Sequence, residues 1–393
     1  PGRPTQRSIQ DQERVDHRVA VVRCESYADV PEALQRGIAL LGGVDAFVSP
    51  GEKLLLKPNI LVGDKPERGT TTHPAVFRAV SEMIVSGGVA LSYGDSPGFG
   101  PVPMAVKSAG YYEIAETLGG TLADFTGTVE TENPEGKLVK QFNLARGVVD
   151  SDGVINLPKF KTHGLTRLTG AVKNLYGCLP GHQKAGYHAA MPDKDQFAEM
   201  LVDLAELVSP RLHIMDGVMG MEGNGPRNGN MREVGVILLS TNPHALDYCA
   251  ARIMDLDPQL VPTLKAAAAR GLYYPEMIEY LGDPLEDFIL PDYDVNRSPS
   301  EKSNSQGFYM TLMRDWVTPR PVIDPVVCSR CGRCIQVCPV DPKALERSDG
   351  ARSLPVYDYS NCIRCFCCQE MCPDAAISIK TPLLGKIADK LRI

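Results

Sequence analysis

The sequence lacks several features that mark common classes of protein. No stretch approaches 18 uninterrupted apolar residues, so we expect no membrane-spanning helix. Residues 1–17 contain no apolar core, which argues against a secretory signal, and we expect this segment to be disordered. Basic residues are outnumbered by acidic ones, which gives a formal net charge of -7. This balance argues against a nucleic-acid-binding surface.

Nucleotide signatures are missing as well. The chain contains neither a GxGxxG pattern nor a P-loop, so hydride chemistry with a nicotinamide cofactor is not indicated. A flavin stays open, because flavin sites have no short signature. The apolar fraction of 43% and the aromatic fraction of 6% are those of an ordinary soluble globular protein. A length of 393 residues fits two domains.

Cysteine, by contrast, is abundant, and eight of the twelve cysteines form two runs with one spacing. The runs are Cys328-x2-Cys331-x2-Cys334-x3-Cys338-Pro339 and Cys362-x2-Cys365-x2-Cys368-x3-Cys372-Pro373. Roughly residues 325–380 thus resemble a bacterial-type ferredoxin with two [4Fe–4S] clusters. In such runs three thiolates bind one cluster and the fourth binds the other. We therefore predict one cluster on Cys328, Cys331, Cys334 and Cys372, and a second on Cys362, Cys365, Cys368 and Cys338. A zinc ribbon fits less well, since it needs two CxxC pairs.

The other four cysteines are scattered singly and do not form a disulfide framework. They are Cys24, Cys178, Cys249 and Cys367. Free thiols together with cluster thiolates indicate a reducing cytoplasm with limited oxygen. Cys367 lies between two predicted ligands, where it is either a bystander thiol or a replacement for Cys368.

The charge of the cysteine-rich segment indicates how it meets its redox partner. Residues 324–380 contain seven acidic and seven basic side chains. Diffusible ferredoxins are usually acidic, which steers them to basic docking patches. A balanced segment favours a fixed partner, first of all the N-terminal part of this chain, with a separate redox protein supplying or accepting electrons.

The region before the cysteines alternates short β-branched runs with helical stretches. Predicted strands are Val19–Val22, Leu54–Leu56, Val89–Ser92, Val154–Leu157, Leu212–Met215 and Val236–Leu239. Predicted helices are Pro31–Leu41, Pro74–Ser86, Asp195–Val208 and Pro243–Met254. This alternation predicts an α/β fold, a mostly parallel sheet with helices on both faces, followed by a small α+β ferredoxin-like domain.

The predicted domain bounds follow from composition. They are a disordered N-terminus at 1–17, an α/β domain at 18–291, a linker at 292–324, a two-cluster domain at 325–380 and an amphipathic helix at 381–393. The basic residues of that last helix suit contact with its own protein, with a partner or with lipid.

Polar residues follow four of the predicted strands. Because the carboxyl ends of parallel strands open on one edge of a sheet, these side chains are expected to share one ligand-binding crevice. They are Lys57, Asp95, Lys159, Lys161, His163, Asp216 and Glu222. Three of the motifs that contain them also have a structural explanation. Lys57-Pro58-Asn59 can simply end a strand, Gly94-Asp95-Ser96-Pro97-Gly98 can form a turn, and Asp216-Gly217 can form another turn. The second of these is also suited to be an anion nest.

The segment from Lys159 to His188 is rich in Lys, His and Gly and contains no acidic residue. A solvated surface is one explanation. Such surfaces are usually helical and mixed in sign, whereas this segment is expected to be a glycine-rich loop. Glycine lets backbone amides approach a ligand, and lysine with histidine suits an anion such as phosphate or carboxylate. Thr70-Thr71-Thr72-His73-Pro74 adds a helix start that also favours an anion.

Short motifs in this region resemble the DUF362 family. They are Lys57-Pro58-Asn59, Thr72-His73-Pro74, Gly94-Asp95-Ser96-Pro97, Lys159-x-Lys161-Thr162-His163, Lys173-Asn174-Leu175-Tyr176-Gly177, Asp216-Gly217-x4-Glu222-Gly223-x-Gly225-Pro226 and Ala245-Leu246-Asp247. The resemblance covers residues 18–285 and extends to the C-terminal ferredoxin module that members often carry. It implies the architecture and the choice of site residues, and it supplies no substrate.

These observations lead to one functional hypothesis with two alternatives. The first is an iron–sulfur oxidoreductase whose catalytic candidates are His163, His73, Lys161, Lys173 and Asp95. Its candidates for binding an anionic ligand or a cation are Lys57, Asn59, Ser96, Lys159, Asn174, Asp216 and Glu222. The alternatives are a non-catalytic electron-transfer subunit that docks on a larger enzyme and a factor that assembles a metal or cofactor. The oligomeric state is left open.

Overall fold

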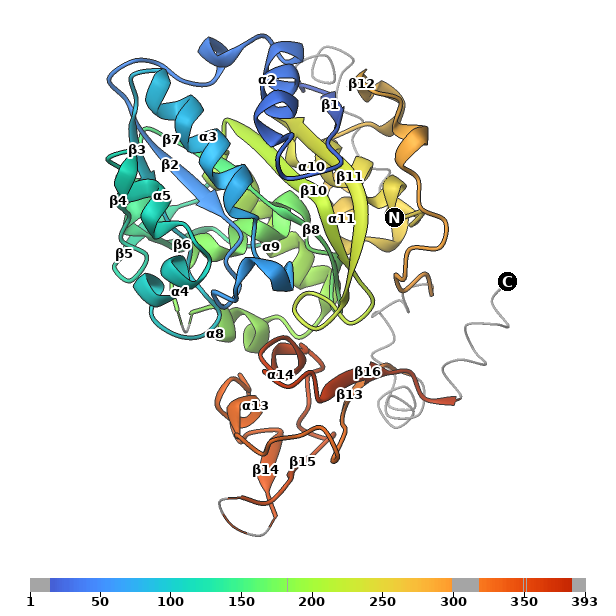
Figure 1. Ribbon diagram of the computed structural model, residues 1–393. Helices are drawn as coiled ribbons and strands as arrows, with labels where there is room; N and C mark the ends of the chain where they lie inside the picture. The colour runs from blue at the N-terminus through green and yellow to red at the C-terminus, as the bar shows by residue number, and fades with distance from the viewer. Residues whose placement is uncertain (1–14, 182, 299–317, 349, 351, 384–393) are drawn as a thin grey trace.

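The computed structural model describes residues 15–181, 183–298, 318–348, 350 and 352–383. The chain forms a larger α/β domain and a smaller C-terminal domain (Figure 1). The predicted helix at 381–393 falls almost wholly outside the described residues, as does most of the segment predicted to be disordered at 1–17. At the end of that segment, His17 is buried against the larger domain.

A ten-stranded, mostly parallel sheet forms the centre of the larger domain. Its main path runs β12 (Glu279–Gly282), β1 (Arg18–Arg23), β11 (Asn230–Ser240), β10 (Leu212–Glu222), β7 (Gly153–Leu157), β2 (Lys53–Pro58), β3 (Ala90–Tyr93) and β4 (Thr121–Leu122). β8 (Lys159–His163) pairs with β10 and with β9 (Arg167–Leu168). β11 is antiparallel to both of its neighbours. A separate hairpin joins β5 (Thr128–Glu132) to β6 (Gln141–Ala145).

Helices cover both faces of this sheet, so the predicted α/β class is confirmed (Figure 1). α2 (Val30–Leu40) and α3 (Pro74–Ser86) pack together on one face. α7 (Gly170–Asn174), α9 (Lys194–Val208), α10 (Pro243–Ile253) and α11 (Pro262–Ala269) lie on the other. The remaining helices of the domain are α4 (Val102–Ser108), α5 (Tyr112–Thr117), α6 (Arg146–Val149) and α8 (Gln183–Ala190). Across the described residues, no helix is both long and apolar enough to cross a membrane.

The four predicted helices are confirmed, each beginning within one residue of its predicted start. Proline occupies the first turn of α3 and of α10, where a backbone N–H has no helical partner to lose. The residue before each proline caps its helix. His73 Nδ1 accepts the N–H of Ala75, and Asn242 Oδ1 accepts those of His244 and Ala245. Such caps satisfy N–H groups that the helix itself leaves free.

Two segments differ from the prediction. β10 continues through Asp216 to Glu222, so the polar residues expected in a loop after this strand lie in an antiparallel ribbon with β11. The basic segment expected to be a glycine-rich loop contains β8, β9, α7 and α8. Its first part is extended because β10 supplies a pairing partner, with Lys159 opposite Asp216 and Lys161 opposite Met221. Strand formation depends on such neighbours more than on local composition.

The smaller domain combines two short antiparallel sheets with two helical turns. β13 (Arg320–Ile323) pairs with β16 (Ile377–Lys380), and β14 (Leu345–Arg347) pairs with β15 (Pro355–Tyr357). The helical turns are α13 (Arg333–Gln336) and α14 (Cys367–Glu370). Within the predicted linker at 292–324, Tyr293 is buried in the larger domain and β13 already belongs to the smaller one. The domain bounds themselves stay a prediction.

The two domains are joined by buried polar contacts between α14 and the turn after β10 (Figure 1). Gln369 Nε2 donates to the backbone oxygen of Asn224 at 3.0 Å and to its side-chain oxygen at 2.9 Å. Arg227 forms an ion pair with Asp64 at 2.8 Å and donates to the backbone oxygen of Met371 at 3.3 Å. Because Gln369 is fully buried and Arg227 nearly so, these bonds are shielded from water and hold the smaller domain at one place.

Candidate functional site

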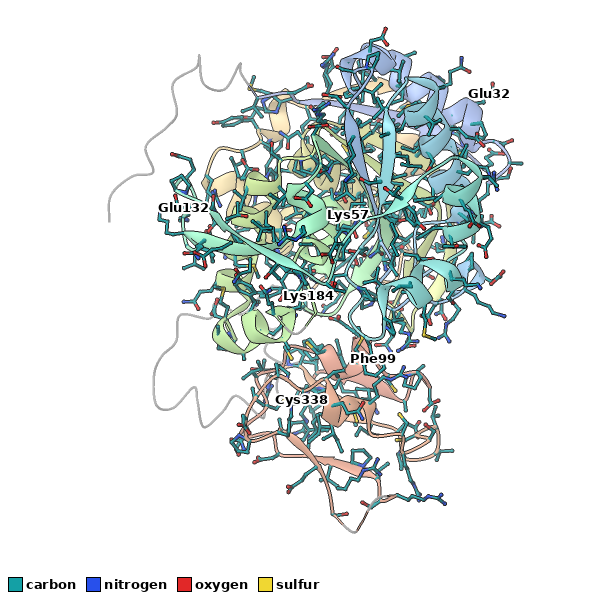
Figure 2. The ribbon with its side chains drawn as sticks, turned by 90° about the vertical axis from the view of Figure 1, so that its left-hand side faces the viewer. Glu32, Lys57, Phe99, Glu132, Lys184 and Cys338 are labelled. Atoms are coloured by element: carbon teal, nitrogen blue, oxygen red, sulfur yellow. The ribbon has the colours of Figure 1, made fainter. Side chains whose placement is uncertain are left out.

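A cavity of about 660 Å³ lies where the two domains meet. The larger domain contributes the residues that follow β2 and β3, together with parts of β8, α7 and α8. The smaller domain contributes residues of α13 and α14 and the segment that follows α13. Figure 2 shows Lys184 and Phe99 on the side of the larger domain that faces Cys338 in the smaller one. The cavity thus opens at the carboxyl edge of the sheet, the usual place for a ligand in an open α/β fold.

The structure brings some of the predicted residues to this cavity and leaves others away from it. Those that line it are Asn59, Asp95, Ser96, Lys161, His163, Lys173 and Asn174. Those that do not are Lys57, His73, Lys159, Asp216 and Glu222. The single crevice expected for all the polar strand ends therefore receives only part of the set.

Lys57 and Asp95 form a buried ion pair at the wall of the cavity. Lys57 Nζ lies 2.8 Å from Asp95 Oδ1, with side-chain exposures of 0% and 4%. The other carboxylate oxygen accepts the N–H of Ile60 at 2.9 Å. A Cβ atom at Gly177 would come within 1.8 Å of the carboxylate, so only glycine allows this approach. Lys57 therefore acts behind the wall by holding Asp95 in place.

Lys184 joins α8 to the loop that follows β3. Its three N–H groups donate to the backbone oxygen of Ser96 at 2.5 Å, to Ser96 Oγ at 2.9 Å and to the backbone oxygen of Pro97 at 3.2 Å. The same Ser96 hydroxyl accepts the N–H of Gly181 at 3.0 Å. Burial lowers the pKa of Lys184 to about 7, even though the charge of Asp95 favours the protonated form. The Ser96 loop and this lysine make one cationic end of the cavity.

Lys161 and Lys173 make a second cationic region. Lys161 Nζ donates to the backbone oxygen of Thr70 at 2.6 Å, and burial with the nearby charge of Lys159 lowers its pKa to about 7. Lys173 Nζ lies 4.6 Å from the centre of the Tyr176 ring. Burial lowers the pKa of Lys173 as well, against the charge of Glu370. Neither lysine forms an ion pair with a carboxylate of the described residues, so both can bind an anion without breaking such a pair.

His163 faces a carboxylate from the smaller domain. Its Nε2 lies 3.1 Å from Glu370 Oε1, with side-chain exposures of 2% and 10%. His163 Nδ1 accepts the N–H of Leu165 at 3.0 Å, so a neutral ring carries its proton on Nε2, toward Glu370. Burial lowers the pKa of His163, against the effect of Glu370. Burial alone would raise the pKa of Glu370, but the contact with His163 and the charge of Lys173 lower it to about 2.

A separate buried network contains three of the predicted residues that are absent from the cavity. Lys159 Nζ lies 2.8 Å from Asp216 Oδ2 and donates to the Tyr27 hydroxyl, also at 2.8 Å. The Asp216 carboxylate accepts the backbone N–H of His73 at 2.8 Å, and the His73 ring stacks on Tyr27 with centroids 3.5 Å apart. The helix start predicted to receive an external anion is thus occupied by the carboxylate of Asp216. Burial lowers the pKa of His73.

The predicted cation site finds no support in this geometry. Glu222 lies in the ribbon of β10 and β11, where its Oε2 accepts the N–H of Asp294 at 3.1 Å. Asp95 and Asp216 each neutralise a lysine. In the parts of the chain that the structure describes, no three His, Cys, Asp or Glu side chains are placed to hold a single metal ion.

The predicted cluster ligands come together in the smaller domain. Five of them, Cys334, Cys338, Cys362, Cys368 and Cys372, form its buried core, and Cys328 packs against them. None of the eight forms a disulfide. Burial, with smaller contributions from the nearby Cys328, Cys331 and Cys372, raises the pKa of Cys334 to about 11. Cys365 and Cys338 are among the neighbours of Cys362. The division of the eight cysteines between two clusters stays a prediction.

These surroundings fit a cubane cluster, in which each thiolate binds a different iron, better than a single ion. The backbone N–H of Arg330 donates to Cys328 Sγ at 3.4 Å, and the hydroxyl of Tyr357 lies 3.1 Å from Cys368 Sγ. Hydrogen bonds to cluster sulfurs tune reduction potentials. Cys367, which the spacing leaves out of register, lines the cavity instead.

Sequence reasoning missed three residues of the cavity as functional candidates. Glu370 lies between two cysteines of a metal-binding run, where a carboxylate carries no motif of its own. Lys184 belongs to the basic segment, and Tyr176 belongs to a motif quoted above, so a signal existed for both. What the sequence could not indicate is which basic residue faces the cavity.

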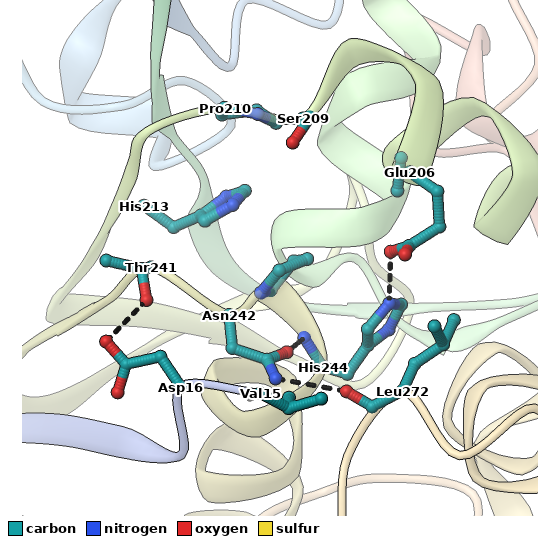
Figure 3. A pocket seen from close by; sticks show the side chains of 12 residues that line it. Val15, Asp16, Glu206, Ser209, Pro210, His213, Thr241, Asn242, His244 and Leu272 are labelled. Atoms are coloured by element: carbon teal, nitrogen blue, oxygen red, sulfur yellow. Dashed lines mark hydrogen bonds and ion pairs between the residues drawn. The ribbon is translucent and has the colours of Figure 1, made fainter. Parts of the chain in front are cut away.

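A second pocket, of about 280 Å³, lies at the amino end of β10 (Figure 3). His213, His244 and Glu206 line it, and His244 Nε2 contacts Glu206 Oε1 at 3.0 Å. Asp16 accepts the hydroxyl of Thr241 at 2.9 Å on its other side. No residue predicted to be functional lies there, and we assign it no role.

Comparison with known proteins agrees with this two-part architecture. The family model described as Domain of unknown function (DUF362) matches residues 54–252, and a 4Fe-4S dicluster domain matches residues 320–373. The chain is 38% identical over 257 residues to the Thylakoid-associated protein sll1697 of Synechocystis, a match that covers 65% of this chain and 79% of that protein.

A solved structure shows a more distant likeness. It is the lactate racemase apoprotein from Thermoanaerobacterium thermosaccharolyticum, at a TM-score of 0.40 and 11% identity. The match covers 61% of this chain, and the chain spans 58% of the racemase. At this level of similarity, nothing about ligand or reaction transfers from the racemase to this chain.

Proposed function

The chain belongs to the DUF362 family and carries a C-terminal 4Fe-4S dicluster domain, and we propose that it is an iron–sulfur oxidoreductase. The family description leaves the activity open, so the proposal rests on the dicluster domain and on the cavity beside it. Its substrate or cofactor is an anion bound in the cavity between the two domains. A separate redox protein gives up as many electrons as the bound molecule gains, or takes up as many as it loses. Cysteine-ligated [4Fe–4S] clusters supply one-electron transfer when bound, and we predict two of them on the eight cysteines.

One observation carries this proposal. Basic side chains of the family domain line the same cavity as two cysteines of the smaller domain, with Lys173 and Lys184 on one side and, on the other, Cys338 of the first run and Cys367, which is not a predicted ligand. A structural linkage between two domains does not require such a cavity. A molecule bound here would lie next to a predicted cluster ligand, Cys338, which suits electron exchange with it.

The side chains around the cavity have distinct roles in the proposal. Lys161, Lys173 and Lys184 bind the anion, and Lys57 keeps Asp95 in position beneath it. His163 and Glu370 donate or accept the proton as a pair, because the Nε2–H of His163 lies 3.1 Å from Glu370 Oε1. Glu370 orients that ring from the smaller domain.

The reducing, oxygen-poor cytoplasm indicated by the cysteines stays a prediction.

Native mass spectrometry of the full chain, purified without oxygen, tests the proposal. The wild type should carry the mass of two clusters together with a small anion that is absent from the denatured chain. Replacing both Lys173 and Lys184 with Gln should remove the anion and leave the iron and sulfide content unchanged. Lys107→Gln, on the exposed surface of α4, is the matched control and should retain the anion. Two clusters with no further mass in the wild type would contradict the proposal and favour a docking subunit.

The proton-transfer role is tested once the co-purified anion has been identified. His163→Ala should lower the rate of its oxidation or reduction by about 10²- to 10⁴-fold, the range for a lost general acid or base. Iron and sulfide content should not change, because His163 is not one of the predicted cluster ligands. Turnover that persists in His163→Ala would exclude this histidine as the proton donor or acceptor.

A further inference from the structure

The cavity contains polar atoms whose hydrogen bonds are unfilled. Asn59 Oδ1, Thr169 Oγ1 and Asn174 Oδ1 are buried, line the cavity and have no partner among the residues that the structure describes. Asn174 is only 4% exposed. Native proteins rarely leave buried polar atoms unpaired, so such a group at a cavity wall indicates a ligand that supplies the missing partner.

The bonds around Asn174 decide what that partner is. Asn156 Nδ2 donates to the backbone oxygen of Ala171 at 3.0 Å, which leaves Asn156 Oδ1 as an acceptor. Asn174 Nδ2 donates to this oxygen at 2.8 Å. The amide of Asn174 is therefore oriented with its nitrogen toward Asn156, and its oxygen, which only accepts, has no partner among the described residues. A ligand that satisfies Asn174 must present a hydrogen-bond donor.

The charges around the cavity decide what else the ligand carries. Of its two carboxylates, Asp95 is paired with Lys57, whereas Glu370 contacts the His163 ring and is also attracted by the charge of Lys173. Lys161, Lys173 and Lys184 have no carboxylate partner in the described part of the chain, and neither has Lys343, which lines the cavity from the smaller domain and is exposed to solvent. Because uncompensated charge is unfavourable in a buried site, a ligand with two or three negative charges matches this wall better than a single anion.

We propose that the ligand of this cavity is a hydroxylated polyanion, whose hydroxyl group donates to Asn174 Oδ1 while its anionic groups contact Lys161, Lys173 and Lys184. This inference rests on the proposed function and narrows its substrate class. A hydroxyl suits the position because it donates to the asparagine and can accept from a lysine at the same time. A protonated amine would place one more positive charge beside three lysines, and an amide N–H donates without accepting.

Pairs of acids that differ by one hydroxyl test the inference. Citrate and tricarballylate share three carboxylates, and malate and succinate share two, but only citrate and malate carry a hydroxyl. Affinities would be measured by titration calorimetry on the anaerobic holo-protein at pH 6.5. At least one hydroxylated acid should bind about tenfold more tightly than its partner, the gain from one additional well-formed hydrogen bond. Asn174→Ala should reduce this ratio to about one, whereas Asn143→Ala, on the exposed side of β6, should leave it unchanged.

Each outcome decides the matter. Equal binding within both pairs by the wild type would overturn the hydroxyl assignment and leave the proposed anion-binding function standing. A preference that persists in Asn174→Ala would overturn the assignment to Asn174. Failure of all four acids to bind would overturn the inference, while the native mass measurement still judges the proposed function separately. The comparison within the wild type needs no variant, so the inference is testable even if Asn174→Ala does not fold. Inorganic phosphate serves as a fold check, because its binding should survive in that variant.

Discussion

At the residue scale, lysines with similar sequence surroundings are put to different uses. Lys159 and Lys161 are two positions apart in β8 and both are fully buried, yet one meets a carboxylate and the other a backbone oxygen. Residues at this spacing point to the same side of a strand. The difference arises because β10 places Asp216 opposite Lys159 and Met221 opposite Lys161. Lys159 is thereby a structural residue, and Lys161 keeps its charge for a ligand.

The lowered pKa values of the cavity lysines predict how anion binding depends on pH. Burial brings Lys161 and Lys184 to a pKa of about 7, so each is charged below pH 7 and neutral above it. Affinity for succinate, whose own charge changes little over this range, should fall between pH 6.5 and 8.5. Well above pH 7 the fall approaches about tenfold per pH unit for each lysine that must be protonated. Calorimetry at a series of pH values measures it. Lys161→Gln or Lys184→Gln should weaken binding and flatten the profile, whereas an affinity that does not change with pH would contradict charged lysines as ligands.

At the scale of elements, the short helix α7 carries two key residues of the cavity, Lys173 and Asn174. It is held in place by Asp247, which lies far away in sequence on α10. The carboxylate of Asp247 accepts the N–H groups of Ala171 at 2.5 Å and Val172 at 3.2 Å. Burial raises the pKa of Asp247 to about 7, against the lowering effect of these two bonds. Five residues are too few for an independently stable helix, so α7 depends on this cap from another element.

Removing that cap should loosen α7 and weaken ligand binding together. In Asp247→Ala the amides of Ala171 and Val172 lose their acceptor, which costs about 1–3 kcal/mol locally. Hydrogen exchange followed by mass spectrometry should show faster exchange in the peptide that contains α7, and calorimetry should show lower succinate affinity. Asp257→Ala removes the cap of a helical turn away from the cavity and is the control for both measurements. Unchanged exchange in α7 would rule out the cap.

At the scale of the whole molecule, the cavity exists because the smaller domain is held against the carboxyl edge of the sheet. The contacts that hold it are mostly hydrogen bonds from Gln369, Asn228 and Arg227 to backbone oxygens across the interface. Every residue has a backbone oxygen, so the acceptors of these hydrogen bonds cannot be recognised from the residue types in the sequence. Glu370 is part of the same contact and brings a carboxylate of the smaller domain to His163.

Loss of the central interface residue should separate the domains without unloading the clusters. Gln369→Ala removes donors to Asn224 and Gly225 from a fully buried position. Small-angle scattering should show a larger radius of gyration, and succinate affinity should fall, because the lining from the smaller domain moves away. Iron and sulfide content should match the wild type. Asn361→Ala breaks a hydrogen bond to Asp358 on the exposed surface and should change neither measurement. Unchanged scattering by Gln369→Ala would show that the domains are joined by other contacts.

The extent of successful prediction differs among these scales for physical reasons. Helices α3 and α10 were predictable because proline and a capping residue mark their starts locally. The strand β8 was not, since Lys159, Lys161 and His163 become extended only where β10 supplies hydrogen bonds and Asp216 supplies a counter-charge. Of the predicted site residues, Asp95 and Lys173 line the cavity, whereas Glu222 lies away from it at the end of β10. The apolar pattern of the sequence does not show that this strand continues as far as Glu222.

By itself the sequence determined the α/β class, the family and the cysteines expected to bind iron–sulfur clusters, because these depend on periodicity, caps and spacing along one chain. The tertiary structure alone decided which charges meet. Lys57 is matched by Asp95, Lys159 by Asp216 and His163 by Glu370, whereas Lys161, Lys173 and Lys184 keep no carboxylate partner among the described residues. These pairings join residues that are 38 to 207 positions apart in the sequence. A buried lysine stabilises the fold where packing places a carboxylate beside it, and it is free to bind an anion where packing does not.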